Sequence, residues 1–228
     1  MKMIEILKTS SLFSAMTEED ITLLLRCLAP IRKKYKKEAY ILRQNEASTQ
    51  IGILLSGSVL VIKEDFWGER TIVSKIEVGG IFAEAFASTS GTPLEVSIQA
   101  QSQSSEETEV LFLDFQRILN TCTNACTFHA ALIENLLSVL AQKNIMLTRK
   151  IELLSKKTTR EKLLAYLSAE SIRQKKATFT IPFNRQELAD YLSVDRSAMS
   201  TELSKLRQEE VISYQKNQLS LLKHEIIH

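Results

Sequence analysis

Cysteine and histidine are scarce in this chain, and their scarcity excludes several kinds of site. Three of the 228 residues are cysteine and three are histidine. Cys27, Cys122 and Cys126 are an odd number at spacings that do not indicate a disulfide framework. No histidine precedes His129, so the first 128 residues lack the clustered imidazole ligands on which metal enzymes depend. We therefore expect no metal site, no catalytic residue and no cofactor.

Long hydrophobic runs and a secretion signal are also missing. No apolar run approaches the roughly 20 residues that a membrane helix needs. The segment Met1–Thr9 carries an acid and lacks the apolar centre of a signal peptide, so we expect a cytoplasmic protein with no membrane contact. The composition, 44% hydrophobic and 25% charged, is typical of a globular chain with one large or two small domains.

The acidic and basic residues are unevenly distributed, although the net charge is only +2. Residues 1–142 hold 13 Lys/Arg against 17 Asp/Glu, whereas residues 143–228 hold 16 against 10. A basic C-terminal part is what contact with nucleic-acid phosphates requires. A solvated helix face is the alternative interpretation of such a charge excess.

Short β-like segments follow a first helix, Ile21–Leu28, for which Thr17 and Asp20 form a near capping box. Glycines separate these segments, with a tight turn expected at Ser56–Ser58 and a hairpin tip at Asp65–Gly68. Many short strands with regular turns predict a β-roll of the jelly-roll type. The expected strands are Ala39–Arg43, Ile51–Leu55, Ser58–Lys63, Thr71–Ile76, Leu94–Gln99 and Glu109–Asp114. The segment Arg32–Lys37 is expected to be a basic, solvated edge.

One long helix is expected over Ala130–Ser155, which contains neither glycine nor proline. Its apolar positions alternate by four and three residues, as in the seam of a coiled-coil dimer, and Asn144 on this seam can fix the register. The seam residues are Ile133, Leu137, Leu140, Asn144, Leu147, Ile151 and Leu154. A second stripe, expected to pack on the β domain, consists of Leu132, Leu136, Val139 and Met146. The alternative to a dimer helix is a helix that is buried within a single chain.

Two short helices near the C-terminus carry the most informative motif. Asn184 and Glu187 form a capping box that predicts a helix from Arg185, and Asp195 caps the second helix. An apolar inner face and a polar outer face on that second helix match the reader of a helix-turn-helix. The predicted DNA-binding residues are Arg185, Asp195, Arg196, Ser197, Ser200, Thr201, Ser204 and Lys205. A helix pair inside an α-helical domain does not explain the short polar residues outside.

The neighbouring segments complete a winged domain. Thr159 is expected to cap a helix over Arg160–Ser171, and Val211–Tyr214 with Leu219–Leu222 is expected to form a hairpin wing around Lys216 and Asn217. The predicted fold class is therefore α+β, with three parts. These are a β-roll sensor domain (residues 1–125), a dimerisation helix (126–156) and a winged helix-turn-helix (157–228).

This order of parts resembles the Crp/Fnr family of bacterial transcription regulators over essentially the whole chain. Leu55–Val59 is similar to the family's strand–glycine turn, and Gly80–Glu84 is similar to its phosphate-binding cassette. Arg185–Ala189 and Asp195–Ser200 resemble its two DNA-binding helices. The resemblance implies a homodimer on a palindromic DNA operator, with half-sites about one turn or roughly 34 Å apart. A signal in the β-roll would shift the dimer helix.

The resemblance also implies contact with RNA polymerase, through Asp65–Gly68 and Arg173–Thr178. On the reader helix, the Glu-x-x-Ser-Arg pattern of the oxygen regulators is replaced by Ser197, Ser200 and Thr201. We therefore expect a different operator, or greater dependence on Arg196 and on DNA shape.

The expected effector pocket departs from that of the cyclic-AMP-binding members. Their Arg-Ser pair is replaced here within Pro93–Val96 by Leu94 and Glu95, and a glutamate beside a phosphate is unfavourable by on the order of 1 kcal/mol. Ala83 replaces the usual glycine. We therefore expect an effector other than cyclic AMP. Glu84 could bind a hydroxyl or a cation, or cap a backbone turn. The expected pocket residues are Phe82, Ala83, Glu84, Ala85, Leu94, Glu95 and Val96.

Other sensing chemistries of the family find little support. The N-terminal cysteine cluster of its iron–sulfur members is absent, and Cys122 with Cys126 offers two ligands only. His129 is expected at a helix surface or an interface rather than on a haem. Two alternatives from other classes stay open. A cupin-type metal enzyme would need histidines on the strands, and an effector-responsive module for a protein partner would leave the helix-turn-helix unexplained.

Overall fold

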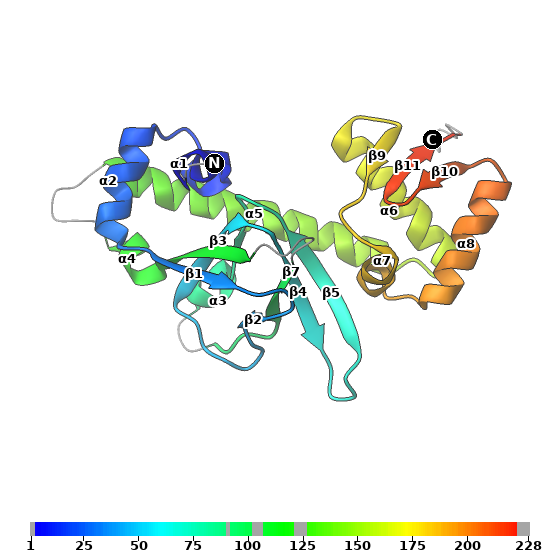
Figure 1. Cartoon of the computed structure of the whole chain (residues 1–228), viewed down its shortest axis with the longest axis horizontal. Coiled ribbons are helices and arrows are strands. Elements are labelled where there is room, and N and C mark those ends of the chain that lie inside the picture. The colour runs from blue at the N-terminus through cyan, green and yellow to red at the C-terminus, as the bar shows by residue number, and fades with distance from the viewer. Residues whose placement is uncertain (1–2, 90–91, 102–106, 121–126, 223–228) are drawn as a thin grey trace. The chain divides into compact units, whose positions relative to one another are not determined.

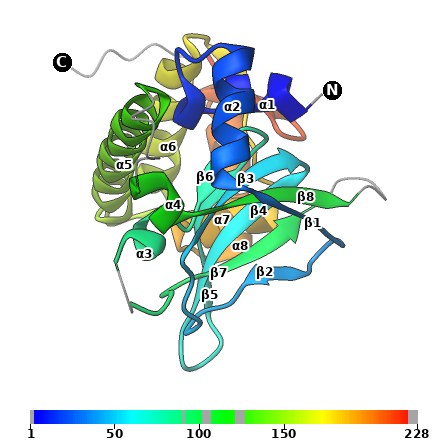
Figure 2. The same ribbon diagram turned by 90° about the vertical axis from the view of Figure 1, so that its left-hand side faces the viewer.

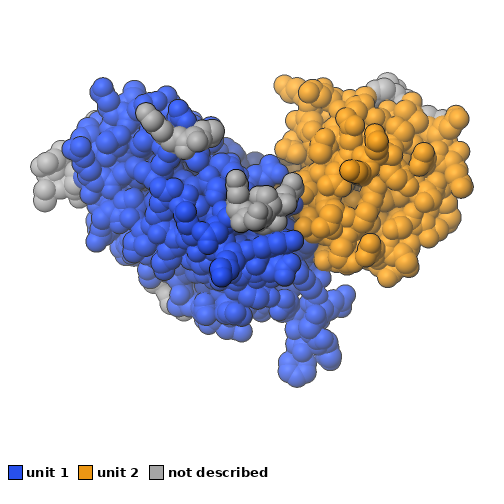
Figure 3. All heavy atoms as spheres, viewed as in Figure 1, with its two compact units in different colours: residues 1–145 blue, residues 146–228 orange. Residues whose placement is uncertain are grey.

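The computed structural model describes residues 3–89, 92–101, 107–120 and 127–222, and its chain separates into two compact units, residues 1–145 and 146–228 (Figure 3). Cys122 and Cys126 lie outside the described residues. The first unit is a β-roll with short helices, and the second is a winged helix-turn-helix (Figure 1). A single long helix, α5 (Thr127–Leu154), runs from the first into the second. The predicted fold class is confirmed.

Two four-stranded antiparallel sheets form the roll, in the orders β1-β8-β3-β6 and β2-β7-β4-β5 (Figure 2). Buried residues of both sheets pack together between them, including Leu54 and Phe112 from one sheet and Val59 and Ile98 from the other. The strands are β1 (Ile31–Tyr35), β2 (Tyr40–Leu42), β3 (Gln50–Ser56), β4 (Ser58–Glu64), β5 (Arg70–Ile76), β6 (Ile81–Phe82), β7 (Ser97–Gln101) and β8 (Thr108–Asp114).

Strand β3 is buried on both faces, which explains its continuous apolar sequence. Leu54 enters the core between the sheets, whereas Ile51 and Ile53 join a second core that includes helix residues. Gly52 allows the Phe82 ring to lie against the strand, because a Cβ at Gly52 would lie 2.2 Å from that ring. The helices of this unit are α1 (Met3–Thr9), the 3₁₀ turn η1 (Ser11–Phe13), α2 (Glu18–Leu28), α3 (Glu84–Ser88) and α4 (Phe115–Leu119).

The stripe of α5 that was expected to pack on the β domain does so at three of its four positions. Leu132, Leu136 and Val139 are buried in the core that includes β3 and α2. Met146 is 43% exposed, so its assignment to this stripe was wrong. His129 was expected at a helix surface or an interface, and its exposure of 1% excludes the surface position.

Several local predictions hold and others need correction. The turn at Gly57, the hairpin tip at Gly68 and the capping box of Thr17 are all present. The edge strand β1 occupies part of the segment expected to be a solvated edge, and β7 begins at Ser97 rather than at Leu94. Strands β6 and β9 were not expected, because each has only two or three residues.

The C-terminal unit packs three helices beside a small sheet of order β10-β11-β9. Thr158, rather than Thr159, caps α6, and its hydroxyl accepts a hydrogen bond from the Glu161 amide at 3.1 Å. The elements are α6 (Thr159–Gln174), β9 (Thr178–Thr180), α7 (Arg185–Leu192), α8 (Arg196–Gln208), β10 (Ile212–Gln215) and β11 (Gln218–Leu221). Among the described segments, no helix combines the length and apolarity needed to cross a membrane.

Candidate nucleic-acid interface

Helices α7 and α8 each start at an N-cap residue that the sequence predicted. The Asn184 carboxamide oxygen accepts from the Glu187 amide at 2.9 Å, and the Glu187 carboxylate accepts from the Asn184 amide at 3.0 Å. Asp195 accepts from the Ala198 amide at 2.8 Å. The hydroxyl of Ser197 and this amide hold the pKa of Asp195 below its usual value, so its carboxylate stays charged at the helix start. The helix-turn-helix is therefore set by local capping.

The outer face of α8 is uncovered, and its inner face anchors the helix. Met199, Leu203 and Leu206 are at most 1% exposed. The exposed positions include Arg196, Ser197, Ser200, Thr201, Ser204 and Lys205. The geometry therefore presents every predicted residue of the reader helix to solvent while the helix itself is fixed by burial.

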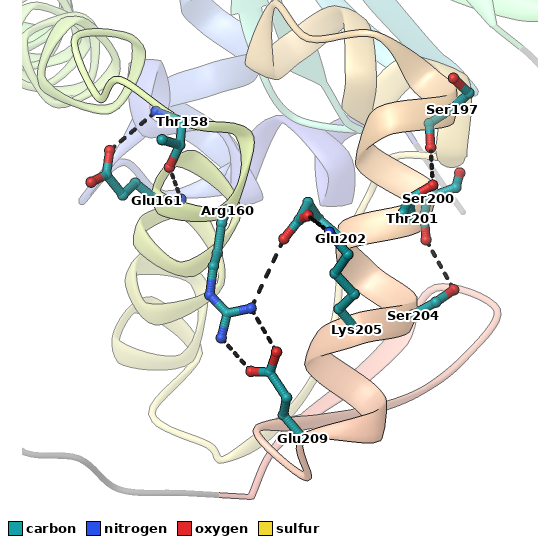
Figure 4. A network of polar contacts seen from close by, with 10 residues as sticks. All are labelled: Thr158, Arg160, Glu161, Ser197, Ser200, Thr201, Glu202, Ser204, Lys205 and Glu209. Atoms are coloured by element: carbon teal, nitrogen blue, oxygen red, sulfur yellow. Dashed lines mark hydrogen bonds and ion pairs between the residues drawn. The ribbon is translucent and has the colours of Figure 1, made fainter.

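Hydroxyl groups on this outer face form an ordered ladder (Figure 4). Ser200 donates to the Arg196 carbonyl at 2.8 Å. Thr201 donates to the Ser197 carbonyl at 3.0 Å and Ser204 to the Ser200 carbonyl at 3.0 Å, and Figure 4 draws these two bonds. Each hydroxyl proton is thereby satisfied within the helix, and the oxygen lone pairs remain available as acceptors. Such a surface suits the amino groups of cytosine and adenine in the major groove.

An arginine of α6 supports α8 from the side opposite to the ladder (Figure 4). The Arg160 guanidinium makes a bidentate contact with Glu209, with one branch at 3.1 Å, and lies 3.9 Å from Glu202. Glu202 also accepts from Lys205 at 2.7 Å, so this predicted DNA contact is ion-paired. Exposed pairs of this kind add less than about 1 kcal/mol to stability, so their effect is to orient the helix.

An aromatic cluster supports α7. The rings of Phe183 and Tyr191 stack at 4.7 Å between centroids, and Tyr166 lies 5.7 Å from Tyr191. The Lys150 ammonium, from the last turns of α5, lies 3.9 Å from the centre of the Tyr191 ring. Lys150 is 8% exposed, and burial lowers its pKa to about 8. The Tyr191 ring therefore favours the charged form of Lys150, whereas burial disfavours it.

Stability is expected to rise with pH because of Lys150. The unfolded chain binds this proton up to about pH 10.5, whereas the folded protein releases it near pH 8, so deprotonation favours the folded state between these values. The free energy of unfolding should increase by roughly 1–2 kcal/mol between pH 8 and pH 10. Urea titrations at several pH values will measure it. Lys150→Met should remove this rise, and an equal rise in that variant would contradict the assignment.

Four of the seven predicted effector residues belong to one core or pack against it. Phe82 and Leu94 are buried in the core between the sheets, together with Ala83. Val96 packs against that core, whereas Ala85 is exposed. Glu95 is also exposed and lies 3.7 Å from the Lys63 ammonium.

Glu84 stands apart from this set because it is a buried, ion-paired acid. It is 5% exposed and its carboxylate lies 2.8 Å from the Lys143 ammonium of α5. Lys143 also donates to the Ile81 carbonyl at 2.8 Å, while the second carboxylate oxygen of Glu84 is buried without a hydrogen-bond partner among the described residues. Ala83, just before it, has a left-handed backbone with φ of 64°. Sequence reasoning missed Lys143, which is 59 positions away.

The predicted dimer seam on α5 is largely uncovered. Leu137, Leu147 and Ile151 are 61%, 43% and 69% exposed, and Asn144 is also exposed. Ile133 and Leu140 are half-buried and pack against the core of the first unit. An apolar row along one helix is therefore exposed in the single chain.

Comparison with protein-family models assigns a description to each unit. Residues 32–124 match the cyclic nucleotide-binding domain, and residues 161–225 match the Crp-like helix-turn-helix domain. Together these two matches span most of the chain. A search of curated proteins found no match.

Several solved structures share the fold over almost the whole chain. FixK2 from Bradyrhizobium japonicum is 19% identical with a TM-score of 0.66, and the match covers 86% of this chain and 94% of that one. The c-di-GMP-responsive regulator CLP from Xanthomonas campestris is 17% identical with a TM-score of 0.70, covering 91% and 100%. A CooA mutant from Carboxydothermus hydrogenoformans is 19% identical with a TM-score of 0.70, covering 98% and 92%.

Proposed function

Because this chain belongs to the Crp/Fnr family of DNA-binding transcription regulators, we propose that it acts as a homodimer on a two-fold symmetric operator, under the control of a signal received by its β-roll. The observation that carries this proposal is the outer face of α8. Its polar side chains are exposed, and its inner face is buried. A helix held in this way can enter the major groove without losing its own packing.

Arg196 is the specificity-determining residue in this proposal. It stands at the first position of α8, and its five donors suit a guanine edge or a phosphate. Arg196→Ala should weaken binding to the operator by about 10–100-fold, with a smaller loss on unrelated DNA. Competition gel shifts will measure both losses on duplexes that the wild-type protein selects from a random pool.

The matched control is Arg173→Ala, which removes another exposed arginine, one that pairs with Glu170 on its own helix. Thermal melts of both variants should agree with the wild type, because both side chains are exposed. Equal affinity of Arg196→Ala and wild type for the selected duplex would remove Arg196 from the reading surface.

The homodimer is supported by the exposed apolar row on α5. Leu137, Leu147 and Ile151 lie along one side of the helix, and exposed apolar residues grouped in this way are typical of an interaction surface. Pairing of two such helices would bury these side chains and place two α8 helices on successive turns of one DNA face.

The proposed effector is a molecule other than cyclic AMP. The acid that could bind a ribose hydroxyl, Glu84, already holds the Lys143 ammonium of the dimer helix. Leu94, which replaces the family's phosphate-binding cation, is buried in the core between the sheets. Glu95, which replaces the family's hydroxyl, faces solvent beside Lys63. A signal that altered the Glu84–Lys143 contact would act directly on α5.

We place the contact with RNA polymerase at the β4–β5 hairpin tip. Phe66 and Trp67 at this tip are 94% and 86% exposed, and the hairpin extends beyond the rest of the first unit (Figure 1). Segment Arg173–Thr178 of the second unit also lies at the surface.

A further inference from the structure

Two arginines that are distant in sequence meet at one tyrosine of the wing. The Arg185 guanidinium, from the first turn of α7, lies 4.8 Å from the centre of the Tyr214 ring. The Arg207 guanidinium, from the last turn of α8, lies 5.5 Å from the same ring centre. Tyr214 belongs to β10, so one aromatic ring brings cations from both helices of the motif to the wing.

Neither guanidinium is neutralised by an acid within the described residues. The other arginines that hold charged partners, such as Arg32, Arg160 and Arg173, each pair with a glutamate. Arg185 instead donates to the Lys216 carbonyl at 3.3 Å, and its Nη1 atom is buried without a hydrogen-bond partner among the described residues. Burial also lowers the pKa of Arg185, which marks a guanidinium that is poorly solvated in the free protein.

Two cations near one ring repel each other, and an anion that contacts both relieves this repulsion. A guanidinium presents planar, paired donors that match the oxygens of a phosphate group. The Tyr214 ring holds the planes of both arginines by cation–π contact, so less side-chain freedom is lost when the anion binds. Lys216, exposed at the wing turn, adds a third positive charge nearby.

We propose that Arg185 and Arg207, held on the Tyr214 ring, form a clamp for a phosphodiester group of the DNA backbone at the base of the wing. The clamp rests on the proposed function and adds Arg207 as a contact and Tyr214 as a positioning residue. Because it binds phosphate and not bases, its contribution is independent of DNA sequence.

The salt dependence of DNA binding tests the clamp, because each phosphate contact changes the slope of log K against log [salt] by about 0.9. Arg207→Gln should reduce the magnitude of this slope by about 0.9 per protomer and weaken binding about equally for the selected duplex and for a random duplex of the same length. Fluorescence anisotropy with full-length protein, from low to moderate salt, gives both quantities. Arg26→Gln, at an exposed position of α2 in the first unit, should leave the slope unchanged.

Tyr214 variants separate positioning from folding. Tyr214→Phe retains the ring and should leave affinity and slope unchanged, whereas Tyr214→Leu should lower affinity several-fold and reduce the slope. The melting temperature of each variant reports any loss of fold. If Tyr214→Leu proves unstable, Arg207→Gln still tests the clamp. Arg207 is exposed, so we expect its substitution to leave the fold intact.

The outcomes distinguish the clamp from the regulator proposal. A wild-type protein that binds DNA, together with an unchanged slope for Arg207→Gln, would overturn the clamp alone. A loss for Arg207→Gln that is confined to the selected duplex would also overturn it, since that result indicates a base contact. A wild-type protein that binds neither duplex at low salt would overturn both proposals.

Discussion

Replacing Ile151 with aspartate should convert the proposed homodimer into monomers. Ile151 is 69% exposed in the single chain, so the change leaves the interior of the protomer unaltered. In a symmetric pair of α5 helices it would place two carboxylates at the seam and remove two apolar side chains, each of which gains about 1.5–3 kcal/mol from burial. Sedimentation velocity at micromolar concentration should show the mass of a single chain.

Loss of the dimer should also abolish tight operator binding. Two linked reader helices bind two half-sites with an advantage of about 100-fold or more over one. Ile151→Asp should therefore weaken binding to a two-half-site duplex by at least about 100-fold, and its binding to an isolated half-site should change little. A variant that remains dimeric would exclude this row as the interface.

Ile172→Asp is the matched control, because Ile172 is 74% exposed and belongs to α6, not to the seam. It introduces the same charge in place of the same side chain and should leave both mass and affinity unchanged. Leu140 is a less suitable position for this experiment. It packs against the core of its own unit, so an aspartate there would disturb folding as well as pairing.

The sequence predicted best those features that depend on neighbouring residues. The capping box of Asn184 with Glu187 fixed the start of α7, and Asp195 fixed the start of α8. The absence of glycine and proline predicted the length of α5, which begins at Thr127. Each of these signals acts within one helical turn or along one helix, and tertiary structure did not override it.

The features that the sequence did not reveal depend on contacts between distant segments. Lys143 meets Glu84 only because α5 passes the cassette, and Arg207 meets Tyr214 only because the wing folds back on α8. The short strand β6 has no periodicity to detect, and it forms because it pairs with β3. Glu95, which was expected in the pocket on grounds of sequence position, is exposed and lies 3.7 Å from Lys63 of β4, a contact that the sequence did not reveal.

Lys143→Met should destabilise the first unit substantially. The substitution removes the cation that compensates Glu84, whose side chain is only 6% exposed, and leaves a buried carboxylate. Breaking a fully buried ion pair in this way costs about 3–5 kcal/mol. Because the Lys143 side chain is 29% exposed, we expect a loss nearer to 2–4 kcal/mol in the free energy of unfolding, measured by urea titration near pH 7.

The double variant shows whether the charge pair or the packing is responsible. Glu84→Gln removes the carboxylate charge but retains the side-chain shape, and Lys143 keeps its hydrogen bond to the Ile81 carbonyl. Combining it with Lys143→Met leaves no uncompensated charge, so the double variant should be more stable than Lys143→Met alone. The double-mutant cycle should give a coupling of about 1–3 kcal/mol. Additive losses would mean that Glu84 and Lys143 act independently, and α5 would then lack this electrostatic link to the cassette.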